Sequence, residues 1–306
     1  TSGANNLISG DTNGAFDVFV RDRQSGTTER VSLDSLGAQG NGDSYSDSIS
    51  ADGRYVAFLS DASNLVSGDT NATFDIFVRD RQSGTTERVS LDSLGAQANG
   101  QSYPGSISAD GRYVAFYSSA SNLVSGDTNG ALDTFVRDRQ SGTTERLSLD
   151  SLGAQGNGES YEPSISADGR YMAFYSSASN LVSGDTNGTT DVFVHDRQSG
   201  TTERLSVSSL GAQGNDRSES PSITADGSCV AFHSLASNLV SGDTNGFHDI
   251  FVRDRCGPAT SATFSGDGIN ADTIAPVNVV LGSTWSAPLT LGHAHGSGGP
   301  IVLKLR

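Results

Sequence analysis

The chain has little positive charge. Its 306 residues contain 19 Lys and Arg against 35 Asp and Glu, a formal net charge of −16, and Lys304 is the single lysine. Nucleic acids and anionic membrane surfaces are bound by clustered basic side chains, so neither is an expected partner. The chain also lacks any run of 18 apolar residues, so we expect no transmembrane span.

The chain begins at Thr1 without a methionine or a basic-then-apolar signal segment. Secretory leaders have both a basic and an apolar region, so we expect a mature or shortened form of the protein. Glycine, by contrast, is abundant at 37 residues. Added to the 34% of hydrophobic residues, it gives the ordinary share of a globular protein and indicates many turns.

A repeat of 58 residues determines the expected architecture. The aspartate ahead of the string Phe-Val-(Arg/His)-Asp-Arg recurs five times, at Asp17, Asp75, Asp133, Asp191 and Asp249. The string Arg-Gln-Ser-Gly-Thr-Thr-Glu-Arg returns intact at 23–30, 81–88, 139–146 and 197–204. Only the fifth copy departs from it.

Each unit is expected to form four short strands. In the second unit these are residues 46–50, 54–59, 75–79 and 86–91, and Asp52-Gly53 is a hairpin pair between the first two. The second and third strands are apolar on both faces, whereas the fourth alternates polar and apolar residues. Such units predict an all-β propeller of four-stranded antiparallel blades, with a solenoid of stacked sheets as the alternative.

The repeat resembles that of the TolB-type β-propellers. The string Ser-Ile-Ser-Ala-Asp-Gly-Arg-Tyr-Val-Ala-Phe at 48–58 is similar to their S-P-D-G-x-x-x-A-F signature, and Asp-Ile-Phe-Val-Arg-Asp at 75–80 to the strand that follows it. The resemblance covers roughly residues 1–256. Ala replaces the Pro, and the loop between the second and third strands is much longer.

Five blades are favoured and six are possible, because the first unit lacks its first strand and most of its second. The expected organisation is a propeller over 1–256 and a β-rich tail over 257–306. That tail is expected either to complete the first blade or to begin a further domain.

The long loop of every unit predicts a calcium site. It reads Ser-Gly-Asp-Thr-Asn-(Gly/Ala)-x-x-Asp, and it resembles the D-x-D-x-D-G-x-x-D calcium loops of integrin-type propeller blades. Calcium prefers several oxygen ligands from a tight loop, with a glycine at the bend. The expected ligands, for up to five Ca²⁺ ions, are Ser9, Asp11, Asn13, Asp17; Ser67, Asp69, Asn71, Asp75; Ser125, Asp127, Asn129, Asp133; Ser183, Asp185, Asn187, Asp191; and Ser241, Asp243, Asn245, Asp249.

Two departures weaken these sites. Ser replaces the first Asp in every copy, and Ala72 replaces the glycine of the second, where the bend costs extra energy. Two carboxylates per site imply a dissociation constant of roughly 10⁻⁴ to 10⁻³ M. The alternative is a metal-free Asx turn, whose last aspartate binds loop amides.

The two cysteines are expected to form a disulfide. Cys229 lies at the start of one strand of the fifth unit, and Cys256 follows the end of its antiparallel neighbour. Such a bridge contributes about 3 kcal/mol and indicates an oxidising, extracytoplasmic setting. The alternative is two free buried thiols.

The sequence shows no nucleophile elbow, phosphate loop or zinc-protease motif, so we expect a protein without enzymatic activity. His293 and His295 lack an evident third metal ligand, and Trp285 suits a core role better than sugar stacking. The histidines at 195, 233 and 248 are expected to be surface variants. The repeated Asp22-Arg23 type pairs are expected to form turns and salt bridges between blades.

The expected function is a secreted or cell-surface scaffold of bacterial type, stabilised by calcium, that binds a protein or glycan at its loop tips. The copies differ mainly just after Asp-Thr-Asn, as at 15–16 and 73–74, and before the first strand of each unit. Two alternatives remain: a self-associating subunit of an extracellular filament or surface layer, and a lectin-like propeller.

Overall fold

The computed structural model describes residues 1–255 and, further along, strands 277–281 and 285–289. The chain divides into two compact units, Thr1–Arg255 and Cys256–Arg306. The described residues form strands and turns without a helix, so they include no helix able to cross a membrane. The expected all-β class is confirmed.

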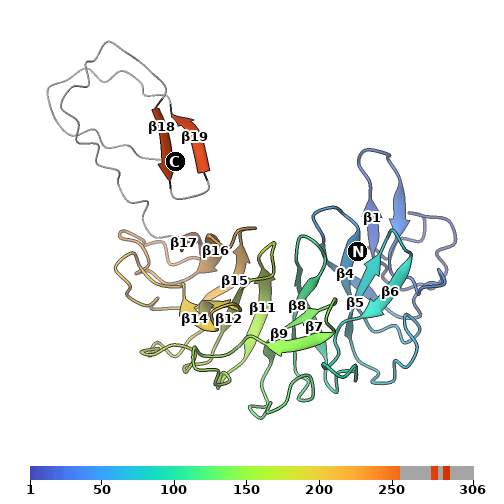
Figure 1. The fold of residues 1–306 in the computed structure, drawn as a ribbon, viewed down its shortest axis with the longest axis horizontal. Helices are drawn as coiled ribbons and strands as arrows, with labels where there is room; N and C mark the ends of the chain where they lie inside the picture. The colour runs from blue at the N-terminus through green and yellow to red at the C-terminus, as the bar shows by residue number, and fades with distance from the viewer. Residues whose placement is uncertain (256–276, 282–284, 290–306) are drawn as a thin grey trace. The chain divides into compact units, whose positions relative to one another are not determined.

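Three complete four-stranded antiparallel sheets form the middle of the first unit (Figure 1). Their strands are β3 (Ser44–Ile49), β4 (Tyr55–Ser60), β5 (Asp75–Asp80) and β6 (Thr85–Arg88); β7 (Ser102–Ile107), β8 (Tyr113–Ser118), β9 (Asp133–Asp138) and β10 (Thr143–Arg146); and β11 (Ser160–Ile165), β12 (Tyr171–Ser176), β13 (Asp191–Asp196) and β14 (Thr201–Arg204). In each sheet the strands pair in chain order, as predicted for blades.

The first and fifth sheets have fewer strands in the described part of the chain. The first pairs β1 (Phe19–Arg21) with β2 (Thr28–Arg30), as expected for a unit without its first two strands. The fifth pairs β15 (Ser218–Ile223), β16 (Cys229–Ser234) and β17 (Asp249–Asp254). In the second unit, β18 (Val277–Leu281) and β19 (Trp285–Leu289) form an antiparallel pair.

Successive sheets meet at their first strands. β3 contacts β7, β7 contacts β11, and β11 contacts β15, whereas the fourth strands lie at the outer edge of each sheet. The amide of Ala51 donates to the carbonyl of Ala109 at 3.0 Å, and Ala109 donates in the same way to Ala167. This arrangement of inner and outer strands is that of propeller blades.

Apolar side chains fill every junction between sheets. Between the second and third sheets, Ile76 and Val78 of β5 pack with Val114 and Phe116 of β8, and none of the four is more than 1% exposed. Burying one such side chain stabilises a fold by about 1.5–3 kcal/mol. Because the units are near copies, the same pair of faces meets at each of the four junctions.

A polar contact repeats at the rim of each junction. Arg139 donates to Glu87 of the preceding sheet at 2.5 Å and to the carbonyl of Gly111, and its guanidinium lies 4.4 Å from the ring centre of Tyr55. Asp22 instead accepts hydrogen bonds from the amides of its own turn. The expected roles of the Asp-Arg pairs, in turns and between blades, are confirmed.

Candidate binding site

In each of the first four long loops, two aspartate carboxylates form ion pairs with the same arginine. In the third unit, Arg146 of β10 lies 3.3 Å from Asp127 and 3.2 Å from Asp133, and Ser148 also donates to Asp133. The corresponding arginines of the other units, at the same position of the outer strand, are Arg30, Arg88 and Arg204. We call each such group of three residues an arginine clamp.

The carboxylates of the clamp are buried, and this changes their titration. Burial raises the pKa of Asp127 above its usual value, the charge of Asp133 raises it further, and Arg146 opposes both effects. The same causes act on Asp69 and Asp185. One guanidinium therefore serves two buried acids, and each clamp keeps a formal charge of −1.

The predicted calcium ligands of these loops have protein partners in the structure. Asn129 donates to Asp133 and to the carbonyl of Gly156, and its own oxygen accepts the amide of Ala131 as in an Asx turn. The first serine of each loop, Ser125 in this unit, is exposed. A cation placed between the two carboxylates would have to displace the guanidinium. Calcium binding by these four loops stays a prediction.

The sharp bend of the loop lies where the sequence indicates. The glycines at this position have φ values of 66° to 70°, and Ala72 takes the same left-handed conformation with φ of 54°. A side chain makes that conformation costly, since Cβ approaches the backbone. The second loop is therefore strained in the way predicted for it.

The fifth loop has no arginine clamp in the described residues. Asp243 and Asp249 form no ion pair there, and the sequence has Ala262 where the other units have the clamp arginine. The loop borders a hollow of about 460 Å³ that both aspartates line. Of the five predicted calcium loops, this one has carboxylates without a cationic partner among residues 1–255. No group of three or more His, Cys, Asp or Glu within the described ranges is arranged to hold a metal.

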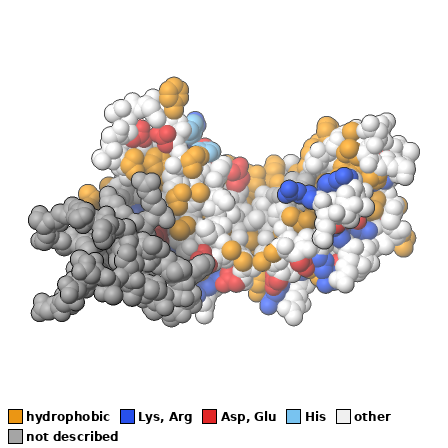
Figure 2. Space-filling model, turned by 90° about the horizontal axis from the view of Figure 1, so that it is seen from above, with side chains coloured by type: hydrophobic (Ala, Val, Ile, Leu, Met, Phe, Trp, Pro, Cys, Tyr) orange, Lys and Arg blue, Asp and Glu red, His pale blue; other side chains and the backbone are white. Residues whose placement is uncertain are grey.

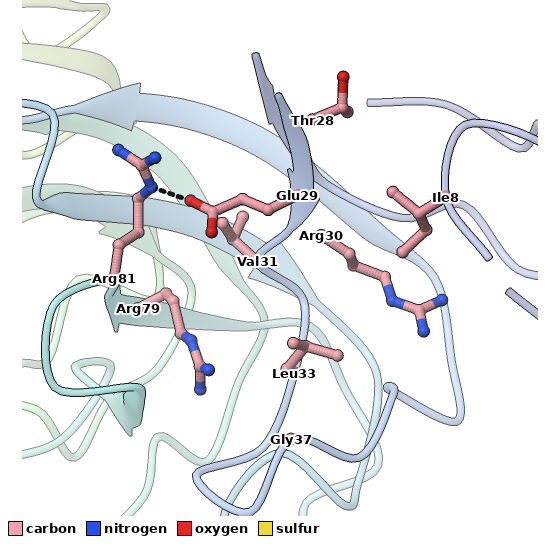
Figure 3. A pocket seen from close by; sticks show the side chains of 9 residues that line it. All are labelled: Ile8, Thr28, Glu29, Arg30, Val31, Leu33, Gly37, Arg79 and Arg81. Atoms are coloured by element: carbon pink, nitrogen blue, oxygen red, sulfur yellow. Dashed lines mark hydrogen bonds and ion pairs between the residues drawn. The ribbon is translucent and has the colours of Figure 1, made fainter. Parts of the chain in front are cut away.

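A second hollow, of about 390 Å³, lies between the first and second sheets. Glu29 points across it to Arg81, whereas Arg30 points to the other side, toward its clamp (Figure 3). All three charged groups are thus engaged in structural contacts, so the hollow offers no free charged group of theirs to a ligand.

The side chains that differ between units come together along one surface. They occupy the second residue of each first strand, the fifth residue of each second strand and the residue before each third strand. We call this set the variable strip: Phe16, Tyr45, Leu59, Phe74, Tyr103, Tyr117, Leu132, Tyr161, Tyr175, Thr190, Glu219, His233 and His248. The amide of Ser102 donates to the carbonyl of Phe74, and equivalent bonds join the other sheets, so the strip passes from sheet to sheet.

Ring contacts make part of the strip continuous. Tyr103 stacks on Tyr117 at 4.8 Å, Tyr117 meets Tyr161 edge-on at 5.9 Å, and Tyr161 stacks on Tyr175 at 5.0 Å. The strip then turns polar, since Glu219 lies 3.4 Å from His233, whose ring contacts that of His248. Figure 2 shows histidine side chains beside a basic one on this surface. The strip thus offers aromatic, acidic and basic groups in sequence.

Two β-bulges shape the polar end of the strip. The register of β11 shifts between Tyr161 and Ser164, and that of β15 between Glu219 and Ser222. Glu162, in the first bulge, has φ of 45°, and Ser220, in the second, has φ of 51°. Bulges redirect side chains, and strained non-glycine residues are typical of functional sites.

Sequence reasoning found two of the three positions of the strip. The residues after Asp-Thr-Asn and before each first strand were expected either to define a partner surface or to be unconstrained. The position in the second strand, held by Tyr117 and Tyr175, was missed. It was detectable, because the hairpin register places Tyr117 opposite Tyr103.

The remaining predicted residues have mixed outcomes. His195 is 5% exposed and bonds Thr202 at 2.8 Å, so the expectation that it lies on the surface was wrong. It faces inward because it replaces an arginine that is also buried in the second and third sheets. Cys229 pairs with Asp254 in the sheet, but Cys256 lies outside the described residues, so the disulfide stays a prediction. His293 and His295 also lie outside the described residues, as does the side chain of Trp285.

No protein-family model and no curated protein matches the chain. Several solved structures are similar. TolB from Acinetobacter baumannii is 19% identical with a TM-score of 0.45, over 78% of this chain and 46% of its own. Putative TolB from Agrobacterium tumefaciens is 16% identical with a TM-score of 0.42, over 79% and 66%. An oligogalacturonate lyase from Vibrio parahaemolyticus is 12% identical with a TM-score of 0.44, over 79% and 57%. The chain spans less than two thirds of the length of each.

Proposed function

We propose that the chain is a non-enzymatic binding scaffold whose contact surface is the variable strip. One observation carries this proposal. The units are otherwise nearly identical, and the surface side chains that change chemical class from unit to unit lie next to one another on successive sheets. Most core positions keep their class, as where Met172 replaces Val114, and Thr134 in place of Ile76 is an exception. A scaffold that keeps its core and varies one surface is suited to selective recognition.

The setting we propose is extracytoplasmic, at the cell surface or in secretion. It is supported by the pair Cys229 and Cys256, which suits an oxidising compartment. Calcium, if bound there, would favour the fifth loop, where Asp243 and Asp249 have no clamp arginine.

Peptide and glycan arrays probed with the wild type and with Tyr103→Ser/Tyr161→Ser test the binding proposal. The matched control is Leu94→Ser/Leu152→Ser, since these two loop leucines are 95% exposed and lie outside the strip. We expect the strip variant to lose the array signal and the leucine variant to keep it. Equal signals from all three proteins, each with a native melting transition, would overturn the proposal.

A second candidate function is self-assembly. Ile250 and Val252 on β17 are 74% and 68% exposed, whereas the equivalent Ile76 and Val78 are covered by the next sheet. Exposed apolar sheet faces of this kind favour association between chains. Light scattering of Ile250→Asp against the wild type tests it. A wild type that stays monomeric at high concentration argues against assembly.

A further inference from the structure

The glutamates of the described chain fall into two groups. Four recur once per unit, and each is paired with an arginine of the next sheet: Glu29, Glu87, Glu145 and Glu203. The other three, Glu159, Glu162 and Glu219, lie in or beside the variable strip, and no arginine or lysine pairs with them in residues 1–255. Among the described glutamates, those without an arginine or lysine partner are therefore the ones at the variable surface.

These three glutamates surround the tyrosine cluster. The hydroxyl of Tyr161 donates to Glu159, and Ser220 of the next sheet donates to Glu162 at 2.8 Å. Thr190 donates to Glu219 at 3.2 Å. Burial first, and then the charges of Glu162 and Glu219, raise the pKa of Tyr175, so both carboxylates act on the same phenol. Carboxylates from two sheets thus converge on one aromatic group.

The stacking of the rings limits what the strip can bind. The planes of Tyr103 and Tyr117 are inclined by 12°, and those of Tyr161 and Tyr175 by 21°, so each ring covers one face of its partner. The partner covers that face, and the other face carries the negative part of the ring quadrupole, which attracts a cation. Together with the tyrosine hydroxyls and the neighbouring carboxylates, these faces favour a ligand rich in hydrogen-bond donors and positive charge.

The chain already makes such a contact within itself. Arg139 lies over the ring of Tyr55 and pairs with Glu87, so one guanidinium satisfies an aromatic ring and a carboxylate together. Guanidinium groups suit both partners because they are planar and carry several donors. The variable strip repeats the aromatic and acidic halves of this contact, and the one arginine beside it, Arg217, contacts His248 rather than a glutamate.

We propose that the strip between Tyr103 and Glu219 binds the arginine or lysine side chains of an extended basic peptide. The inference rests on the proposed binding function and names the ligand class of the same surface. The net charge of −16 would speed encounter with such a peptide and repel polyanions. A second acidic feature, the clamp, is not available to it, because its aspartates are buried with their own arginine.

Isothermal titration calorimetry with a decapeptide of alternating Arg and Ser tests the proposal. The strip variant is Glu159→Gln/Glu162→Gln/Glu219→Gln. The control is Asp22→Asn/Asp52→Asn/Asp110→Asn, which removes the same charge at the hairpins of the opposite sheet ends and keeps an acceptor for each turn amide.

We expect the strip variant to weaken peptide binding at least tenfold and the control to change it less than twofold. Because both variants remove three negative charges, such a difference cannot come from the change in net charge. Equal weakening by both variants, or no binding by the wild type, would overturn the basic-peptide assignment. If the wild type instead binds an arrayed glycan and Tyr103→Ser/Tyr161→Ser abolishes this, the ligand class is wrong but the binding function stands. A melting temperature within a few degrees of wild type confirms that each variant is folded.

Discussion

Ala72 takes the left-handed backbone conformation that Gly130 takes one unit later, with φ of 54° against 66°. Ala72→Gly relieves a strain of about 1–2 kcal/mol, partly offset by the greater freedom of glycine in the unfolded chain. We expect a net gain of about 0.5–1 kcal/mol in the free energy of unfolding, measured by urea titration. The neighbouring change Ala131→Gly, at a residue without positive φ, should lower stability instead. A loss in both variants would contradict the strain.

Removing a clamp arginine should destabilise the fold in a pH-dependent way. Arg88→Leu leaves Asp69 and Asp75 buried without a counter-charge, a defect that costs about 3–5 kcal/mol at neutral pH. Burial already raises the pKa of Asp69, and protonation therefore favours the folded variant as the pH falls toward about 4. Urea unfolding at both pH values should show the smaller loss in acid.

The control for this clamp variant is Arg21→Leu, at an exposed arginine of the first sheet. It should change stability little at either pH. A penalty for Arg88→Leu that is the same at both pH values would show that its aspartates do not titrate as buried acids.

Calcium should act on one loop more than on the others. We expect millimolar calcium, compared with chelator, to raise the melting temperature through Asp243 and Asp249, whose loop lacks the clamp arginine. Asp243→Asn should remove most of this rise, whereas Asp127→Asn should not. A melting temperature that is the same with calcium and with chelator would refute metal binding by all five loops.

His195 should make the stability of the fourth sheet sensitive to mild acid. Burial lowers its pKa, so the unfolded chain takes up the proton first, and stability is lost as the pH falls below about 6.5. Arg137, the equivalent residue, donates to the carbonyl of Asp92 at 2.8 Å. His195→Arg should restore this bond, add about 1 kcal/mol and flatten the profile between about pH 7 and 5.

The strands could be predicted because their ends carry local signals. Asp52-Gly53 fixes the register of the first hairpin, and Gly53 has the expected positive φ of 73°. β3 nevertheless begins at Ser44, two residues earlier than predicted, because a register shift between Ser46 and Ser48 lets the pairing continue. β6 ends at Arg88 rather than at residue 91, since the amide of Leu91 bonds back to Val89.

The site was harder to predict because its contacts cross strands. Arg88 is 13 residues from Asp75 in sequence, and only the pairing of Arg88 with Phe77 brings it beside the loop. The loop motif alone therefore favoured a metal where the structure places a guanidinium. Glu162 and Ser220 take left-handed conformations in their bulges although neither is a glycine. The sequence therefore gives no local signal for these conformations.

The identity of the junctions bears on how this chain changes in length. Every internal junction joins equivalent faces of two neighbouring sheets. A sheet could therefore pack against the sheet two places along the chain as well as against the next one. Unequal recombination that deletes or adds 58 residues would rejoin compatible faces and leave the core intact. We therefore expect the fold to tolerate the gain or loss of one unit, and each such change would extend or shorten the series of side chains along the variable strip.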